Sequence, residues 1–279
     1  MQRLLTRGML ILATVLIPGS AFADLVLPAN GYWVSWTPQQ NSPDGSFFWN
    51  KVTSWDGTDC NIGYVLTGQA TNCGSEVGTL PSGVGALPFW AANSAGTSDV
   101  SKLYFQAQGP AEDIMLQVQF AGNAGPNGNA LYFYQTNAAG TAMVNMTKVF
   151  QGDYSGPVTV DIPVATGEYF GFRLAGPGNS EIFNSTVQGN QFALFREEPT
   201  VNEGNEITTY WIGVEDLPVA SSDADYQDMV FSVTMDPVPE ASVLLVLGAY
   251  LCVLLFGGIL SRRNWPACLN AIPARRNLL

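Results

Sequence analysis

Residues 113–122 read DIMLQVQFAG, a stretch in which apolar and polar side chains alternate. Successive side chains of an extended chain point to opposite faces, so this alternation predicts a β-strand with one buried face. The residues predicted to face the core are Ile114, Leu116, Val118 and Phe120, and those on the other face are Met115, Gln117 and Gln119. Strands of this kind are typical of antiparallel sheets that cover a core on one side.

Further strand-like stretches follow, each bounded by Gly, Asn, Pro or Asp: residues 129–137, 156–165, 167–176, 190–197, 207–215 and 228–235. No comparable stretch between residues 24 and 239 has a convincing helical period. The pattern therefore predicts one all-β domain over residues 24–236, an antiparallel β-sandwich or jelly roll.

The first 23 residues have the features of a secretory signal peptide. Arg3 and Arg7 precede an apolar stretch, residues 9–17, and the small residues Ala21 and Ala23 suit signal peptidase. We therefore expect a signal helix over residues 1–23, with cleavage before Asp24. The mature domain would then be exported.

The charge of the chain is unevenly distributed. Residues 24–239 hold 22 of the 23 acidic residues but only five of the 11 basic ones, a net charge of −17. Such a surface repels phosphate, which argues against a nucleic-acid partner, and it attracts divalent cations. The chain has no histidine, so zinc sites and triad hydrolysis are poor hypotheses, whereas oxygen-ligated ions such as Ca²⁺ remain open.

Cys60 and Cys73 are the cysteines of the predicted exported part. An isolated pair in an exported protein usually forms a disulfide, and closing a loop of this size stabilises the fold by about 3 kcal/mol. The alternative is two unrelated free thiols.

Four tryptophans, Trp33, Trp36, Trp49 and Trp55, lie among turn-forming residues near the start of the predicted domain. Exposed indole rings could stack on sugars and form a glycan-binding platform. The alternative, which large aromatic side chains favour, is that they fill a small β core.

The stretch WIGVEDLPVASSDADYQDMVFSV, residues 211–233, places an acidic loop between two predicted strands. Its carboxylates, Glu215, Asp216, Asp223, Asp225 and Asp228, repel one another unless a cation or backbone N–H groups neutralise them. The sequence therefore predicts a candidate Ca²⁺ site, with a solvated Asx-turn as the alternative.

This loop resembles a motif of secreted bacterial β-domains of unknown function, in which Glu-Asp leads through a turn to Asp-x-Asp-Tyr-Asn-Asp-Met/Leu-Val. Glu215-Asp216 and residues 223–230 match it, with Gln227 in place of the usual Asn. The resemblance implies a domain without established enzymatic activity that Ca²⁺ stabilises.

Residues 243–260 are uncharged and mostly apolar, and a helix of this length reaches about 27 Å, close to the thickness of a bilayer core. Arg262 and Arg263 follow, which places the β-domain outside the cytoplasm by the positive-inside rule. We therefore expect a transmembrane helix over residues 243–260.

Pro239 and Glu240 before this segment, and the arginines after it, resemble the PEP-CTERM sorting signal over residues 237–263. The resemblance implies a Gram-negative, exopolysaccharide-producing source and processing by an exosortase. The protein would then be held in the inner membrane only until it is processed. Ala241 stands where a second proline is usual, and residues 264–279 form a short basic tail beyond the arginines. The alternative is a permanent single-pass anchor.

Together these features predict a non-enzymatic protein of the cell surface or extracellular matrix that is associated with exopolysaccharide. One alternative is a carbohydrate-binding module on a permanent anchor. The other is an envelope hydrolase with dispersed carboxylates, which the missing histidine and the lack of any nucleophile motif disfavour.

Overall fold

A computed structural model of the chain describes residues 24–27, 32–34, 61–67, 87–91, 102–109, 113–122, 128–151, 157–198, 200–202, 205–218, 221–222 and 225–237. The chain divides into two compact units, residues 1–238 and 239–279, and every described residue belongs to the first. The predicted signal helix and transmembrane helix lie outside the described residues. Within the described part, no helix is long and apolar enough to cross a bilayer.

The first of two large sheets has the strand order β1-β4-β9-β6-β7, with β10 also paired to β9. Every pairing in it is antiparallel. Its strands are β1 (Asp24–Val26), β4 (Phe105–Gln108), β6 (Ala130–Thr136), β7 (Val144–Gln151), β9 (Tyr169–Ala175) and β10 (Ile182–Asn184). The predicted strands at 129–137 and 167–176 are thus confirmed as β6 and β9.

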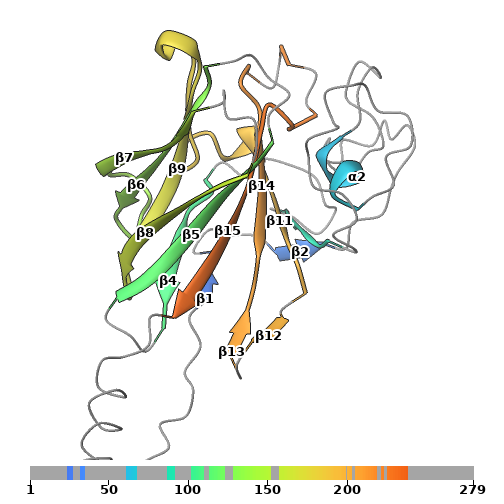
Figure 1. Cartoon of the computed structure of the whole chain (residues 1–279). Coiled ribbons are helices and arrows are strands. Elements are labelled where there is room, and N and C mark those ends of the chain that lie inside the picture. Colours follow the sequence, from blue (N-terminus) through green and yellow to red (C-terminus); the bar gives the residue numbers. More distant parts are fainter. Residues whose placement is uncertain are drawn as a thin grey trace, which may run out of the picture. The chain divides into compact units, whose positions relative to one another are not determined.

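The second sheet has the order β2-β3-β11-β14-β15-β5-β8 and is also antiparallel throughout. Figure 1 shows β15 between β14 and β5. Its strands are β2 (Tyr32–Val34), β3 (Phe89–Ala91), β5 (Asp113–Gly122), β8 (Val158–Ala165), β11 (Phe192–Arg196), β14 (Tyr210–Val214) and β15 (Met229–Pro237). The remaining predicted strands are therefore confirmed as β5, β8, β11, β14 and β15.

A few small elements complete the described part. β12 (Thr200–Asn202) and β13 (Asn205–Ile207) form a two-stranded ribbon. Two 3₁₀ turns occur at η3 (Pro177–Asn179) and η4 (Gly189–Gln191). One short α-helix, α2 (Ile62–Leu66), is capped by Asn61, whose side chain accepts a hydrogen bond from the Gly63 N–H.

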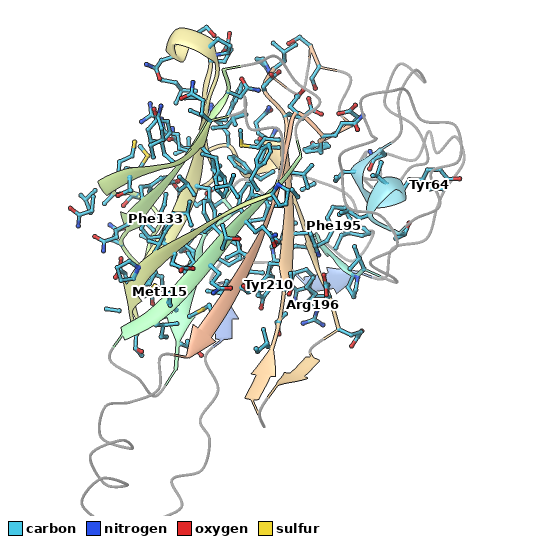
Figure 2. The ribbon with its side chains drawn as sticks, viewed as in Figure 1. Tyr64, Met115, Phe133, Phe195, Arg196 and Tyr210 are labelled. Atoms are coloured by element: carbon cyan, nitrogen blue, oxygen red, sulfur yellow. The ribbon has the colours of Figure 1, made fainter. Side chains whose placement is uncertain are left out.

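The core lies between the two sheets and is rich in phenylalanine. Phe172 of β9 and Phe231 of β15 meet edge to face with 5.0 Å between ring centroids, although they belong to different sheets. Phe133 of β6 and Phe195 of β11 are labelled in Figure 2, and both belong to the same buried cluster. Two antiparallel sheets that share one apolar core are consistent with a β-sandwich.

The alternation in β5 is confirmed by burial. Ile114, Leu116 and Val118 are fully buried, whereas Gln119 on the opposite face is exposed. Burial of such side chains is the main favourable contribution to folding. Because the strands on either side of the acidic loop, β14 and β15, are anchored in this core, the loop has a fixed base.

Candidate functional site

The acidic loop joins β14 to β15, which are neighbours in the second sheet. Val214 pairs with Met229 at the end of the β14–β15 ladder, so residues just after β14 lie beside residues just before β15. Glu215 and Asp216 leave β14, and Asp225 and Asp228 lead into β15. The structure therefore brings these four predicted carboxylates together as one group, here called the carboxylate cluster. Asp223 lies outside the described residues.

Tyr226 closes the loop over the end of β14. Its φ of 61° is in the left-handed region, which non-glycine residues seldom adopt. Its backbone oxygen lies so close to Gly213 that a Cβ at residue 213 would overlap it. The buried phenol hydroxyl of Tyr226 donates a hydrogen bond to the Asn190 carbonyl, 2.7 Å away. Glycine at 213 thus lets the loop fold back onto the sheet.

The carboxylate cluster is unusually buried for acidic side chains. Glu215, Asp216 and Asp225 are 0%, 7% and 4% exposed, and Asp228 is half-buried. Backbone N–H groups offset part of this burial. The Tyr226 N–H donates to Glu215 Oε1 at 2.7 Å, and the Asp216 N–H donates to Asp228 Oδ2 at 2.8 Å. Such hydrogen bonds favour the charged form of a carboxyl group.

Two buried amide side chains border the cluster. Asn129, just before β6, donates from Nδ2 to Asp216 Oδ2 at 2.8 Å, and Gln227 donates from Nε2 to Asp225 Oδ2. Asn129 is fully buried and Gln227 is 1% exposed. Their oxygens, Asn129 Oδ1 and Gln227 Oε1, accept no hydrogen bond among the described residues.

Other elements hold the loop from outside. The Ile62 N–H at the start of α2 donates to the Asp225 carbonyl at 2.9 Å. Gln191, at the end of η4, donates from Nε2 to the Leu217 carbonyl at 2.6 Å. The carboxylate cluster therefore lies in the loop between β14 and β15, and the start of β6, α2 and η4 form hydrogen bonds to this loop.

Burial, and after it the charges of the nearby carboxylates of Glu215, Asp216 and Asp225, raise the pKa of the Asp228 carboxyl from its ordinary value of 3.8 to about 9. The hydrogen bond from the Asp216 N–H opposes this rise. Burial, and then the charge of Glu215, raise the pKa of Tyr226 well above 10.0. Burial and neighbouring carboxylates thus both disfavour the charged form of the Asp228 carboxyl.

The four basic side chains in the described part contact groups other than the cluster. Lys102 donates to the Ala139 carbonyl, Lys148 to Gln151 Oε1, and Arg173 to Met146 Sδ. Arg196 lies over the ring of Trp33, with 4.6 Å from Cζ to the centroid. None of these four cations neutralises the carboxylates.

As the side chains lie, no group of three or more His, Cys, Asp or Glu residues in the described ranges is arranged to hold a metal ion. The carboxylates are instead turned toward N–H donors. Sequence reasoning missed the two amides, because Asn129 is 87 residues from Asp216 and carries no motif. Gln227 was noted only as a departure from the motif.

Trp33 is the member of the predicted glycan platform that the structure describes. It is half-buried and packs edge to face against Trp90, with 5.2 Å between centroids, while Tyr210 lies 6.1 Å away. Arg196 and Tyr210, labelled in Figure 2, pair across β11 and β14 beside it. With Arg196 over its ring, Trp33 has the contacts of a packed aromatic residue.

Several predicted features lie outside the described residues and stay predictions. They are the signal cleavage site at Ala21 and Ala23, the Cys60–Cys73 disulfide, Trp36, Trp49 and Trp55, and the sorting motif of Pro239, Glu240, Ala241, Arg262 and Arg263. Asp24, the residue expected to follow the cleavage, is the first residue of β1.

Comparison with protein-family models and with curated protein sequences finds no match for this chain.

Proposed function

We propose that this chain is a non-enzymatic exported protein of the cell surface or extracellular matrix, released from the inner membrane by an exosortase-type enzyme. The observation that carries the proposal is the order of its parts. A signal-like segment precedes an acidic all-β domain, and Pro239-Glu240, an apolar segment and Arg262-Arg263 follow it.

The described domain supports a structural role. The faces between its sheets are filled by packed side chains, with a cluster of phenylalanines at the centre. Its buried carboxylates bind backbone and amide N–H groups, which is the arrangement of a structural turn. We take its finer architecture to be a β-sandwich of the jelly-roll class, with a signal helix and one transmembrane helix outside it.

Association with exopolysaccharide is part of the same proposal. The net charge of −17 over residues 24–239 favours contact with neutral or cation-bridged glycans over nucleic acid or anionic lipid. Trp33 does not add support to the glycan-stacking alternative, because its ring packs against Trp90 and Arg196.

The test is the intact mass of the protein isolated from its native cells. We expect a chain that begins at Asp24 and ends near residues 239–241, because both signals are removed. A matched strain carrying Glu240→Ala should accumulate a longer chain in the inner membrane. A wild-type mass that retains Arg263 would instead establish a permanent anchor and refute exosortase-type release.

A further inference from the structure

We infer that two copies of this chain associate through the β6–β7 hairpin, residues 130–151, with strand β7 of each copy at the contact. This inference concerns the folded domain and is independent of how the tail is processed. Three observations carry it: the distribution of charge, the exposure of apolar side chains, and the contrast between β7 and the other outer strands.

The hairpin is almost free of charge in an otherwise acidic domain. Residues 24–239 carry a net charge of −17, so two copies repel each other on average. Residues 114–152 contain no Asp or Glu, and Lys148 is their one charged residue. Its Nζ donates to Gln151 Oε1 at 2.8 Å and lies 5.9 Å from the centre of the Tyr132 ring, so this cation is held on its own sheet. We therefore expect the least repulsion between copies where their hairpins face each other.

The lack of charge on the hairpin also selects the partner. Charged surfaces recognise partners of the opposite charge, and the hairpin has neither the acidic residues to attract a basic protein nor a basic patch to attract a polyanion. A second copy of this chain presents the same nearly uncharged hairpin, so the two surfaces are compatible. Such a self-complementary, two-fold contact is the commonest form of protein dimer.

Exposed apolar side chains are concentrated on the same hairpin. Of the five large apolar side chains that are exposed in the described part, three are Met143, Val144 and Met146, at 43%, 52% and 40%. Residues 144–148 are all exposed, so both faces of this end of β7 are open to a partner. Removal of this apolar surface from water favours association.

The other strands at the ends of the two sheets are less suited to such a contact. β1 and β2 have three residues each, and β8 carries the exposed Asp161 and Pro163. Short edge strands, prolines and charged side chains all hinder association at an edge. β7 has eight residues with no proline and no acid, and Figure 1 shows it at the outer edge of the first sheet, beside β6.

The backbone at Asn145 determines the form of the contact. Its φ of 50° is in the left-handed region, and the register between β6 and β7 shifts beside it. Such an irregularity interrupts the edge of a strand. We therefore assign the contact to the side chains of residues 143–147, with the two-fold axis beside Met146, and not to a ladder that continues from one chain to the next. Because a strip of this width buries less than the about 800 Å² per partner of a standard interface, the association is weak and reversible.

The experiment is sedimentation velocity of the full chain in detergent at rising protein concentration, in about 150 mM NaCl to screen the repulsion. We expect a reversible equilibrium between monomer and dimer. Thr147 is exposed on β7 beside the proposed axis. Thr147→Glu and Thr147→Lys each bring like charges together there, and each should weaken association by about tenfold or more. An equal mixture of the two variants should restore the dimer, because opposite charges then face each other.

Thr159→Glu is the matched control. Thr159 is also an exposed threonine on an outer strand, β8, and the variant has the same net charge as Thr147→Glu. It should associate as the wild type does. Recovery of the dimer on mixing excludes misfolding as the reason for weaker association in the single variants.

Three results would overturn the inference. The first is a wild-type chain that remains monomeric at about 1 mM, where even weak complexes form. The second is association of the Thr147 variants that equals that of the wild type, which would place the contact elsewhere, for example in the apolar segment 243–260. The third is a mixture of the two variants that associates no better than either variant alone.

Discussion

At the scale of single residues, Gly213 determines whether the acidic loop can close. The Tyr226 carbonyl and the Ile62 side chain both lie over its Cα, so β14 can carry no side chain at this position. The neighbouring strand residues Ile212 and Val214 are fully buried. The lack of a side chain at residue 213 therefore lets the loop approach β14 closely at Tyr226.

Gly213→Ala should destabilise the domain by about 2–3 kcal/mol, since a buried overlap with backbone cannot be relieved by moving a flexible side chain. The measurement is thermal unfolding of the full chain by circular dichroism. Gly167→Ala is the matched control, because nothing lies within 4 Å of its added Cβ. Its φ of +85° leaves only a conformational cost of about 1–2 kcal/mol. Equal losses in the two variants would contradict the close approach.

The residue scale also shows what the sequence could predict of the site. Glu215, Asp216, Asp225 and Asp228 were found because they cluster along the chain between two strand patterns. Asn129 was not, because its proximity to Asp216 results from the packing of the β6 start against the β14–β15 loop. An uncharged residue far away in sequence gives no local signal of such a contact.

At the scale of elements, period-two alternation predicts strands such as β5, in which buried and less buried residues alternate. β5 and β15 both lie inside the second sheet with a partner on each side, and their alternation was visible. β7, with the sequence VNMTKVFQ, was missed because residues 144–148 are all exposed, so no buried face imposes a pattern. The five-residue helix α2 is too short to show a helical period.

β7 is one of the two outer strands of the first sheet and carries exposed apolar side chains. Val144 is 52% exposed and Met146 is 40% exposed, and β6 is its partner in the sheet. Edge strands with apolar surface promote pairing between chains. β8, one of the two outer strands of the second sheet, instead carries the exposed Pro163, which lacks an N–H to offer a partner.

Val144→Lys should reduce self-association of the purified protein at high concentration and leave its melting temperature within about 1–2 °C. Sedimentation velocity at rising concentration measures the first effect. Val187→Lys, at an equally exposed turn residue that belongs to no strand, is the control and should not change self-association. A similar decrease in both variants would show that added charge alone is responsible.

At the scale of the whole molecule, the net charge of −17 over residues 24–239 opposes compactness. The four described basic side chains contact neutral partners. Because this span holds 22 acidic and only five basic residues, we expect repulsion between acidic side chains to be the main electrostatic effect that salt changes.

Raising NaCl from about 10 mM to about 150 mM shortens the screening distance from about 30 Å to about 8 Å, and should raise the melting temperature by a few degrees. The measurement is made in EDTA, so that bound divalent ions do not contribute. A melting temperature that falls with added NaCl would show that favourable ion pairs outweigh the repulsion.

The position of β15 has a consequence for biosynthesis. It is the last described strand along the chain, yet it lies between β14 and β5 in the middle of the second sheet. The sheet therefore stays divided into two incomplete parts until residues 229–237 have emerged from the ribosome. Because pairing with β5 joins segments distant in sequence, this step is slow compared with local folding. A nascent chain with this strand order cannot complete its second sheet until synthesis has reached residue 237, a delay that would suit the export proposed above.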